Sequence, residues 1–380
     1  MDALMLPLNW QRVRLGDIAE IIGGGTPSTQ VTSFWSGSIN WFTPTEIGIT
    51  KYVYKSQRTI TPLGLKKSSA KLLPIGTILL TSRASIGDCA ILKVVATTNQ
   101  GFQSLIPLEK INNEFLYYLM LTLKNKLLKL ASGSTFLEVS PNKIKNLLIP
   151  LPPLNEQIAI ANILSDVDRY LCALDSLILK KESVKKALSF ELLSQRKRLK
   201  GFNQNWQRVR LGDICEITTG SLDANEMVHY GKYRFYTCAK EYYFIDKYAF
   251  DTEAILISGN GAYVGYVHYY KGKFNAYQRT YVLDNFSEHI IFVKYFLKMF
   301  LQSHIQTNRN EGNTPYIVMA TLKDFEILLP PLNEQIAIAN ILSALDKEIT
   351  SLKNKKRQFE NIKKALNHDL MSAKIRVLKK

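Results

Sequence analysis

Two long stretches of this sequence each occur twice, and this internal repeat constrains the fold more than any other feature. The nine residues Trp10–Ile18 recur letter for letter as Trp206–Ile214, 196 positions later. The fifteen residues Leu151–Ser165 recur as Leu329–Ser343, 178 positions later. Exact duplication at this distance is typical of two copies of one structural unit. We therefore expect the 380 residues to form two related halves.

Between the identical blocks the two copies differ in sequence but keep one order of elements. Segments 76–81 and 254–258 are apolar and β-branched, which predicts a strand in each copy. A glycine-containing turn, a second apolar stretch and a glutamine follow in both. A helix-like segment comes next, at 115–130 and at 292–305. The pattern favours one α/β module used twice, with the 18 extra residues of the first copy placed between Ile22 and Gly76.

A long helix is predicted after each Leu-Pro-Pro. Asn155 and Asn333 are suited to cap its start. Apolar residues then follow with the alternating four-three spacing of a coiled-coil seam. Each helix is expected to run about 45 residues, on the order of 65–70 Å, and to pack on the other because one apolar stripe does not stabilise a lone helix. Lys185 and Lys363 occupy equivalent seam positions. Packed stems with amines in water are favoured there over a role in fixing register.

The expected fold class is α+β: two α/β globules separated by two long antiparallel helices in a coiled coil, related by a pseudo-two-fold axis. The boundaries we predict are 1–151 and 201–329 for the globules, and 152–200 and 330–380 for the helical regions. Such helices would span about two turns of B-DNA, each roughly 34–36 Å. The formal net charge of +17 also favours a polyanionic partner. The sequence thus predicts two readers of short DNA sequences separated by a spacer.

The sequence lacks the motifs that several kinds of catalytic and metal-binding site require. The four cysteines are scattered and the five histidines all lie beyond residue 228, so zinc-ligand spacing is missing. No acidic residue stands two positions before a lysine, as a common nuclease motif needs, and no Gly-Lys precedes Ser or Thr as a P-loop needs. There is no signal peptide pattern and no apolar run of membrane-spanning length. We expect a cytoplasmic, non-catalytic protein without a metal site.

Three motifs resemble the specificity subunit of type I restriction-modification systems. They are the Trp-x-x-Val-x-Leu-Gly-Asp-Ile block opening each half, the Gly-Gly-Gly-Thr-Pro-Ser segment at 23–28, and the Leu-Pro-Pro-Leu-x-Glu-Gln block opening each helix. The resemblance covers essentially the whole chain. It implies a non-catalytic subunit whose two target-recognition domains each read one half of a bipartite, asymmetric site in double-stranded DNA. It also implies two modification subunits carrying S-adenosylmethionine, and restriction subunits that use ATP and Mg. The second half lacks the glycine-rich segment and has Thr218–Leu222 instead, so its recognition domain should belong to another sequence class.

Polar loop residues beside the repeated strands are the candidates for DNA contact, because Arg pairs with guanine and Asn or Gln with adenine through two hydrogen bonds. Residues 1–151 carry 16 basic and 8 acidic side chains, whereas residues 201–329 carry 13 of each. The second domain should therefore depend less on phosphate attraction and more on placed donors. The candidates are Ser82, Arg83, Ser85, Asn99, Gln100, Gln103, Ser134 and Thr135 in the first domain, and Ser258, Asn260, Tyr263, Tyr277, Gln278, Arg279, Asn313 and Thr314 in the second.

Some of these candidates have a second interpretation of equal standing. Gln100 and Gln278 occur in both copies, so they cannot by themselves distinguish two targets, and a structural role fits them as well. Ser134–Thr135 and Asn313–Thr314 each follow a glycine, where an ordinary turn is as good an explanation as phosphate contact.

The shared motif at the helix starts is expected to serve partner binding. Two copies of one surface, related by a pseudo-two-fold axis, suit two copies of one partner. Simple helix capping is the alternative, and the two roles are compatible. The residues are Asn155, Glu156, Gln157, Asn333, Glu334 and Gln335.

Two other functions compete with a DNA specificity subunit. One is the DNA-binding part of a fused methyltransferase or nuclease, against which a full-length chain of 380 residues argues. The other is a coiled-coil adaptor that binds proteins, which predicts no preference among DNA sequences.

Overall fold

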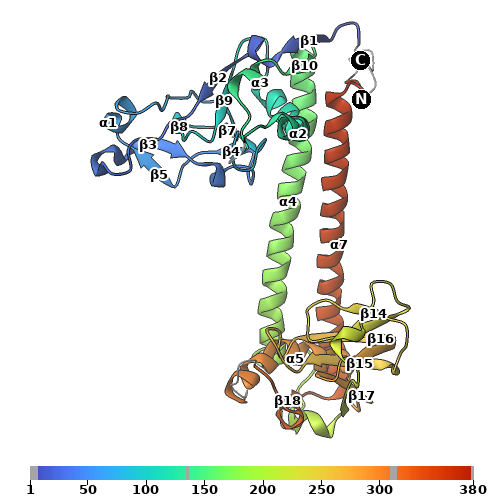
Figure 1. Ribbon diagram of the computed structural model, residues 1–380. Helices are drawn as coiled ribbons and strands as arrows, with labels where there is room; N and C mark the ends of the chain where they lie inside the picture. Colours follow the sequence, from blue (N-terminus) through green and yellow to red (C-terminus); the bar gives the residue numbers. More distant parts are fainter. Residues whose placement is uncertain (1–6, 134–136, 309–314, 378–380) are drawn as a thin grey trace. The chain divides into compact units, whose positions relative to one another are not determined.

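The computed structural model describes residues 7–133, 137–308 and 315–377. The chain forms two compact units (Figure 1). Unit 1 consists of Met1–Asp175 with Lys355–Lys380, and unit 2 consists of Ser176–Asn354. The C-terminal residues thus fold with the N-terminal ones, and each long helix contributes residues to both units. The expected α+β class with an internal repeat is confirmed.

Unit 1 holds a globule with three sheets. A five-stranded sheet has the order β2-β9-β6-β7-β4, a three-stranded sheet the order β5-β3-β8, and a third sheet pairs β1 with β10. The strands are β1 Gln11–Arg14, β2 Ala19–Gly23, β3 Trp35–Phe42, β4 Tyr52–Val53, β5 Arg58–Ile60, β6 Ile78–Leu80, β7 Cys89–Leu92, β8 Ala96–Thr98, β9 Gln103–Pro107 and β10 Leu148–Leu151. The α-helices of this globule are α1 Pro62–Lys66, α2 Asn113–Leu130 and α3 Pro141–Lys145.

Unit 2 repeats this plan with one larger sheet. Its order is β12-β17-β15-β16-β13-β14, and a separate pair joins β11 to β18. The strands are β11 Gln207–Arg210, β12 Glu216–Thr219, β13 Tyr233–Tyr236, β14 Tyr243–Ile245, β15 Phe250–Ser258, β16 Val267–Ala276, β17 Thr280–Asp284 and β18 Glu326–Leu329. The α-helices are α5 Ile290–Asn308 and α6 Met319–Lys323. The long strand β16 stands where unit 1 has both β7 and β8, 178 positions earlier.

The strand and helix predictions for the divergent middles are confirmed. β6 and β15 are the two predicted strands, and α2 and α5 are the two predicted helices. The turn after each strand contains a glycine with positive φ, +90° at Gly87 and +79° at Gly265. Only glycine adopts this conformation without a steric penalty. Its amide closes the turn on the strand end, at 3.0 Å from Thr81 O and 2.7 Å from Ser258 O.

The repeated blocks lie against one another within each unit. Gln11 on β1 pairs with Leu151 on β10, and Gln207 on β11 pairs with Leu329 on β18. Each tryptophan-containing block therefore forms a short antiparallel ladder with four residues that end at the first leucine of a Leu-Pro-Pro block. The ladder brings the two shared blocks together at the start of each long helix.

The two long helices are α4, Leu154–Leu193, and α7, Leu332–Met371. Each has 40 residues, fewer than the 45 expected, and begins one residue before the asparagine expected to cap it. Within unit 1, Asp168 pairs with Lys363 and Asp175 with Lys356, so α7 numbers fall as α4 numbers rise. The segments are therefore antiparallel, as predicted.

The long helices also enter the core of each globule. Ile160 and Leu164 of α4 pack with Phe115 of α2 in unit 1, and Ile338 and Leu342 of α7 pack with the core of unit 2. All four aliphatic side chains are at most 1% exposed. The predicted seam residues at the helix starts thus stabilise the globules as well as the helix pair.

Candidate nucleic-acid interface

The start of each long helix is fixed by a buried carboxylate that accepts hydrogen bonds from one arginine and one tryptophan in both units. In unit 2, Glu334 is 0% exposed and accepts hydrogen bonds from Arg198, at 3.1 and 2.6 Å, and from the indole of Trp206 at 3.2 Å. In unit 1, Glu156 accepts from Arg376 and from Trp10 in the same way. Each arginine follows the end of one long helix, so the contact joins the end of one helix to the start of the other.

The neighbouring glutamine ties each helix start to the globule. Gln157 accepts from the Asn112 amide at 2.9 Å and donates to the carbonyls of Lys110 and Pro152. Gln335 accepts from the His289 amide and donates to Glu288 and to the Pro330 carbonyl.

The six residues expected to bind partners fall into a buried group and an exposed group. Glu156, Gln157, Glu334 and Gln335 are at most 8% exposed and have internal hydrogen-bond partners. Their placement gives these four a structural role and argues against direct partner contact. Asn155 and Asn333 are exposed, so partner binding through the motif stays a prediction for those two.

A second repeated network joins each globule helix to both long helices. In unit 1, the Tyr118 hydroxyl donates to Asp168 at 2.5 Å, and Asp168 also pairs with Lys363. In unit 2, Tyr295 donates to Asp346 at 2.6 Å, and Asp346 pairs with Lys185. Burial and the carboxylate raise the pKa of both tyrosines. Burial opposes ionisation of Asp346, but the hydrogen bonds from Lys185 and Tyr295 outweigh it and lower its pKa.

The two seam lysines therefore meet carboxylates. The interpretation that their amines reach only water is wrong for the described structure, because each forms an ion pair and its side chain is only 24–26% exposed. The pairing lysine comes from the other long helix in both units, which favours a role in helix register.

In unit 1, two polar loops meet beside the strand ends. The loop after β6 carries Arg83 and Ser85, and the loop after β8 carries Asn99 and Gln100. The Ser82 amide donates to the Gly101 carbonyl at 2.8 Å, which holds the loops together. Arg83, Ser85 and Gln100 are exposed, although Arg83 is also paired with Glu138 at 3.0 Å.

The glycine-rich segment at 23–28 packs against the second of these loops. The Gly25 amide donates to Thr98 O at 2.8 Å, and Thr26 donates its hydroxyl hydrogen bond to Gln100. A Cβ built on Gly24 would lie 1.9 Å from Asn99 O, so only glycine fits there. Gln100 thus has a structural contact, in agreement with its second interpretation, while its exposure leaves DNA contact open.

Two tryptophans anchor the same segment from the other side. The Trp41 indole donates to Gly25 O at 2.9 Å and the Trp35 indole donates to Ser28 O at 3.0 Å. The guanidinium carbon of Arg58 lies 3.8 Å from the Trp35 ring centroid and 5.3 Å from that of Trp41. Sequence reasoning missed this group, because it falls in the region where the first copy has extra residues and the repeat offers no comparison.

Unit 2 presents a corresponding pair of loops with different side chains. The loop after β15 carries Asn260 and Tyr263, and the loop after β16 carries Tyr277, Gln278 and Arg279. The Gly259 amide donates to Arg279 O at 2.8 Å, in the position of the Ser82 contact in unit 1. Tyr263, Gln278 and Arg279 are exposed, and the Lys240 amine lies 5.1 Å from the Tyr263 ring.

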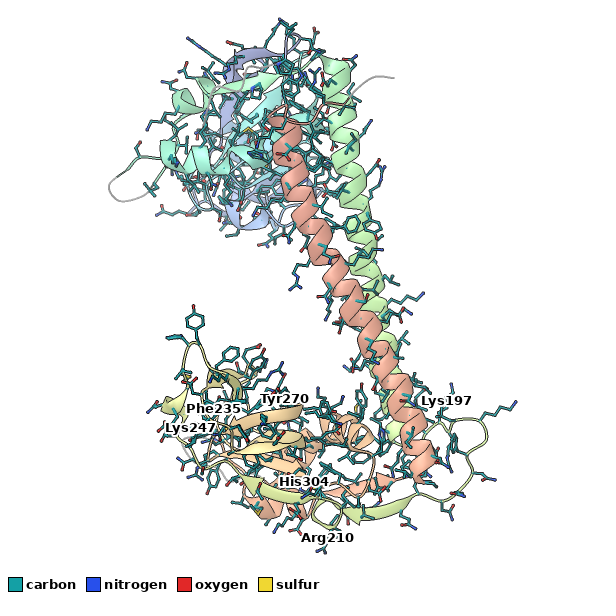
Figure 2. The ribbon with its side chains drawn as sticks, turned by 90° about the vertical axis from the view of Figure 1, so that its right-hand side faces the viewer. Lys197, Arg210, Phe235, Lys247, Tyr270 and His304 are labelled. Atoms are coloured by element: carbon teal, nitrogen blue, oxygen red, sulfur yellow. The ribbon has the colours of Figure 1, made fainter. Side chains whose placement is uncertain are left out.

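An aromatic group on the sheet of unit 2 was also missed. Arg234 on β13 lies between the rings of Tyr242 and Tyr270, at 4.2 and 4.5 Å from their centroids. Figure 2 shows Tyr270 on the sheet of unit 2. The sequence contains 19 tyrosines, but single-sequence patterns do not show which rings meet.

The other expected DNA contacts fall into two groups. Ser82, Gln103 and Ser258 are 1%, 6% and 0% exposed, so their placement argues against contact with DNA. Ser134, Thr135, Asn313 and Thr314 lie outside the described residues.

The exposed groups that meet at these loops are hydrogen-bond donors and acceptors and aromatic rings, which suit base edges and phosphates. Among the described residues, no group of three or more His, Cys, Asp or Glu side chains is placed to hold a metal ion. In the same part of the chain, no helix is both long and apolar enough to cross a membrane.

Comparison with known proteins identifies the family. The model of the type I restriction modification DNA specificity domain matches residues 7–182 and again residues 203–361. A type I restriction enzyme MjaIX specificity subunit from Methanocaldococcus jannaschii is 29% identical over 99% of this chain and 96% of its own. The Escherichia coli EcoDI specificity subunit is 37% identical over 44% of this chain and 37% of its own.

Solved structures agree with the fold. The crystal structure of a type I restriction-modification S subunit from M. genitalium covers 96% of this chain and 98% of its own, with 19% identity and a TM-score of 0.63. Because the family model matches most of the chain in two copies, the chain belongs to the type I restriction-modification DNA specificity domain family.

Proposed function

We propose that this chain is the DNA specificity subunit of a type I restriction-modification complex and reads a bipartite, asymmetric site, with one half per recognition unit. The observation that carries this proposal is the combination of one repeated scaffold with two different exposed surfaces. The helix-start networks are the same in both units, down to the Trp–Glu–Arg contact. The exposed loops of unit 1 and those of unit 2 share almost no residues.

The two surfaces suit different DNA sequences. Unit 1 presents Arg83, Ser85 and Asn99 beside an overall basic globule. Unit 2 presents Asn260, Tyr263, Tyr277 and Arg279 on a globule of balanced charge. Hydrogen-bond donors of different identity at equivalent loops specify different bases. Gln100 and Gln278, which both units carry, are better suited to holding the loop or the backbone.

The other parts of the proposed complex follow from the family. The chain itself supplies recognition and no chemistry. Two modification subunits would carry S-adenosylmethionine, and restriction subunits would use ATP and Mg, in the cytoplasm. The exposed Asn155 and Asn333, at equivalent places in units 1 and 2, are candidates for contact with two copies of one partner.

Exchanging residues 11–150 for the corresponding segment of a related subunit tests whether each unit recognises one half of the DNA site. We expect one half of the methylated DNA sequence to change while the other half stays, because residues 11–150 belong to unit 1 and the exchange leaves unit 2 unaltered. Single-molecule sequencing of methylated genomic DNA reads both halves at once.

Three results would contradict the proposal. A change in both halves would refute independent recognition by the two units. A chain that binds DNA without sequence preference, or not at all, would favour the protein adaptor. Methyl transfer by the purified chain alone would favour a fused enzyme.

A further inference from the structure

We propose that Arg58 reads a guanine in the half-site recognised by unit 1. This inference rests on the proposed function and names one residue that determines its specificity. It is carried by the geometry of Arg58 with Trp35 and Trp41, which none of the loop candidates shares.

The guanidinium of Arg58 is held by its flat face. Its central carbon lies 3.8 Å from the centroid of Trp35, which is a stacking distance, and 5.3 Å from that of Trp41. The two indoles meet edge to face, with centroids 5.0 Å apart and an interplanar angle of 88°. A guanidinium that stacks on an aromatic ring contacts it through its flat face. Its five N–H groups point outward in the plane of the guanidinium and stay available for hydrogen bonds.

The tryptophans that hold Arg58 are themselves fixed. The Trp41 indole donates to Gly25 O, the Trp35 indole donates to Ser28 O, and Trp41 is 4% exposed. Neither ring can turn without losing a hydrogen bond to the glycine-rich segment. Arg58 is therefore positioned before any ligand arrives, which lowers the entropy lost on binding.

Arg58 also differs from three other arginines of unit 1 in its charge partners. Arg83 pairs with Glu138, Arg169 with Asp166, and Arg376 with Glu156. Among the described residues, no carboxylate lies within ion-pair distance of Arg58, whose side chain is exposed. The N–H groups of its planar guanidinium are thus available to a hydrogen-bond acceptor on a bound ligand.

The position of Arg58 fits the same half-site as the loop candidates. Arg58 lies opposite Trp41 on the neighbouring strand, and Trp41 lies opposite Thr97, two residues before Asn99. Three adjacent strands place Arg58 on the order of 10 Å from Thr97, since strands are about 4.8 Å apart. Base pairs rise about 3.4 Å each, so the separation of Arg58 from Thr97 corresponds to about three base pairs.

A guanine is the base that matches this donor pattern. Its O6 and N7 both accept in the major groove, and an arginine fork binds the two together, whereas adenine offers one acceptor beside a donor. A phosphate also accepts two hydrogen bonds, but a phosphate contact has no sequence preference. The experiment separates these two acceptors.

The test uses the full chain assembled with its modification subunits, and the variants Arg58→Lys and Arg58→Gln. Lysine keeps the charge and loses the planar fork. We expect discrimination at one G·C pair of the unit 1 half-site to fall about 10-fold or more in both variants, with the unit 2 half unchanged. A duplex with 7-deazaguanine at that position, which lacks the N7 acceptor, should weaken binding by the unaltered chain and not by Arg58→Lys.

Arg169→Lys is the matched control, because Arg169 is 79% exposed on α4 and pairs with Asp166 of the same helix. It should leave the methylated sequence unchanged. An unchanged sequence in Arg58→Lys would overturn the inference. Arg58→Gln could instead lose the same affinity for every DNA sequence, with the slope of log affinity against log salt concentration reduced in magnitude by about 0.9. That result would assign Arg58 to a phosphate contact and would also overturn the inference.

The inference and the proposed function fail in different ways. If the unaltered chain directs methylation of a bipartite sequence and Arg58→Lys directs the same one, only the inference fails. If the unaltered chain directs no such methylation, the proposed function fails. Equal thermal unfolding of Arg58→Lys and the unaltered chain excludes misfolding as the cause of any change.

Discussion

Glu334→Ala is expected to lower the free energy of unfolding of unit 2 by about 3–5 kcal/mol, because it leaves the guanidinium of Arg198 without its partner in a buried site. Glu334 is fully buried, and Arg198 contacts both carboxylate oxygens. The Trp206 indole loses its acceptor in the same variant. Amide hydrogen exchange measures the loss of stability in each unit separately, when peptides from unit 2 are compared with peptides from unit 1.

Glu326→Ala is the control for this prediction. Glu326 pairs with Arg208 in the same unit, but the two side chains are 54% and 66% exposed. Exposed ion pairs contribute roughly 0–1 kcal/mol, so we expect little change in exchange. Glu156→Ala should destabilise unit 1 less than Glu334→Ala destabilises unit 2, since Arg376 is more exposed than Arg198. Equal effects of Glu334→Ala and Glu326→Ala would contradict a structural role for the shared motif.

Gly24→Ala is expected to destabilise unit 1 by about 1–3 kcal/mol or to displace the Asn99–Gln100 loop. The new methyl group would lie 1.9 Å from Asn99 O and 2.5 Å from the Thr98 hydroxyl, and a backbone oxygen cannot turn away as a flexible side chain does. Either result should weaken recognition of the unit 1 half-site. Urea unfolding and binding to the specific duplex measure the two effects separately.

The adjacent Gly23→Ala provides a close control. Its methyl group would meet only the Gln103 amide, at 3.6 Å or more, which is ordinary contact. Gly220→Ala in unit 2 should behave like Gly24→Ala, because its methyl group would lie 1.9 Å from Ala276 O. If Gly23→Ala and Gly24→Ala were equally tolerated, the packing of the glycine-rich segment on the loop would be wrong.

The repeat made most of the fold predictable. Identical blocks at 196 and 178 positions indicated two copies, and hydrophobic spacing indicated both long helices. The divergent middles could still be aligned through Gly87 and Gly265, whose positive φ requires glycine in both. These features depend on local conformation and periodicity, which a single sequence expresses well.

The site was harder to predict because side-chain direction depends on tertiary contacts. Ser82 follows β6 and Ser258 ends β15, next to turns where polar residues are usually exposed, yet both side chains are buried. Glu156 and Glu334 resembled surface residues because their arginine partners lie more than 100 positions away. The equivalence of Arg198 and Arg376, 178 positions apart, was a signal in the sequence that could have found this contact.

The central claim is that this chain selects the DNA sequence methylated by a type I complex. Sequencing the methylated bases of cells with and without the gene tests it most directly. We predict that removal of the gene abolishes methylation at one bipartite sequence, and that restoring the gene returns it. Methylation that is the same with and without the gene, in cells that express the modification subunits, would contradict the claim.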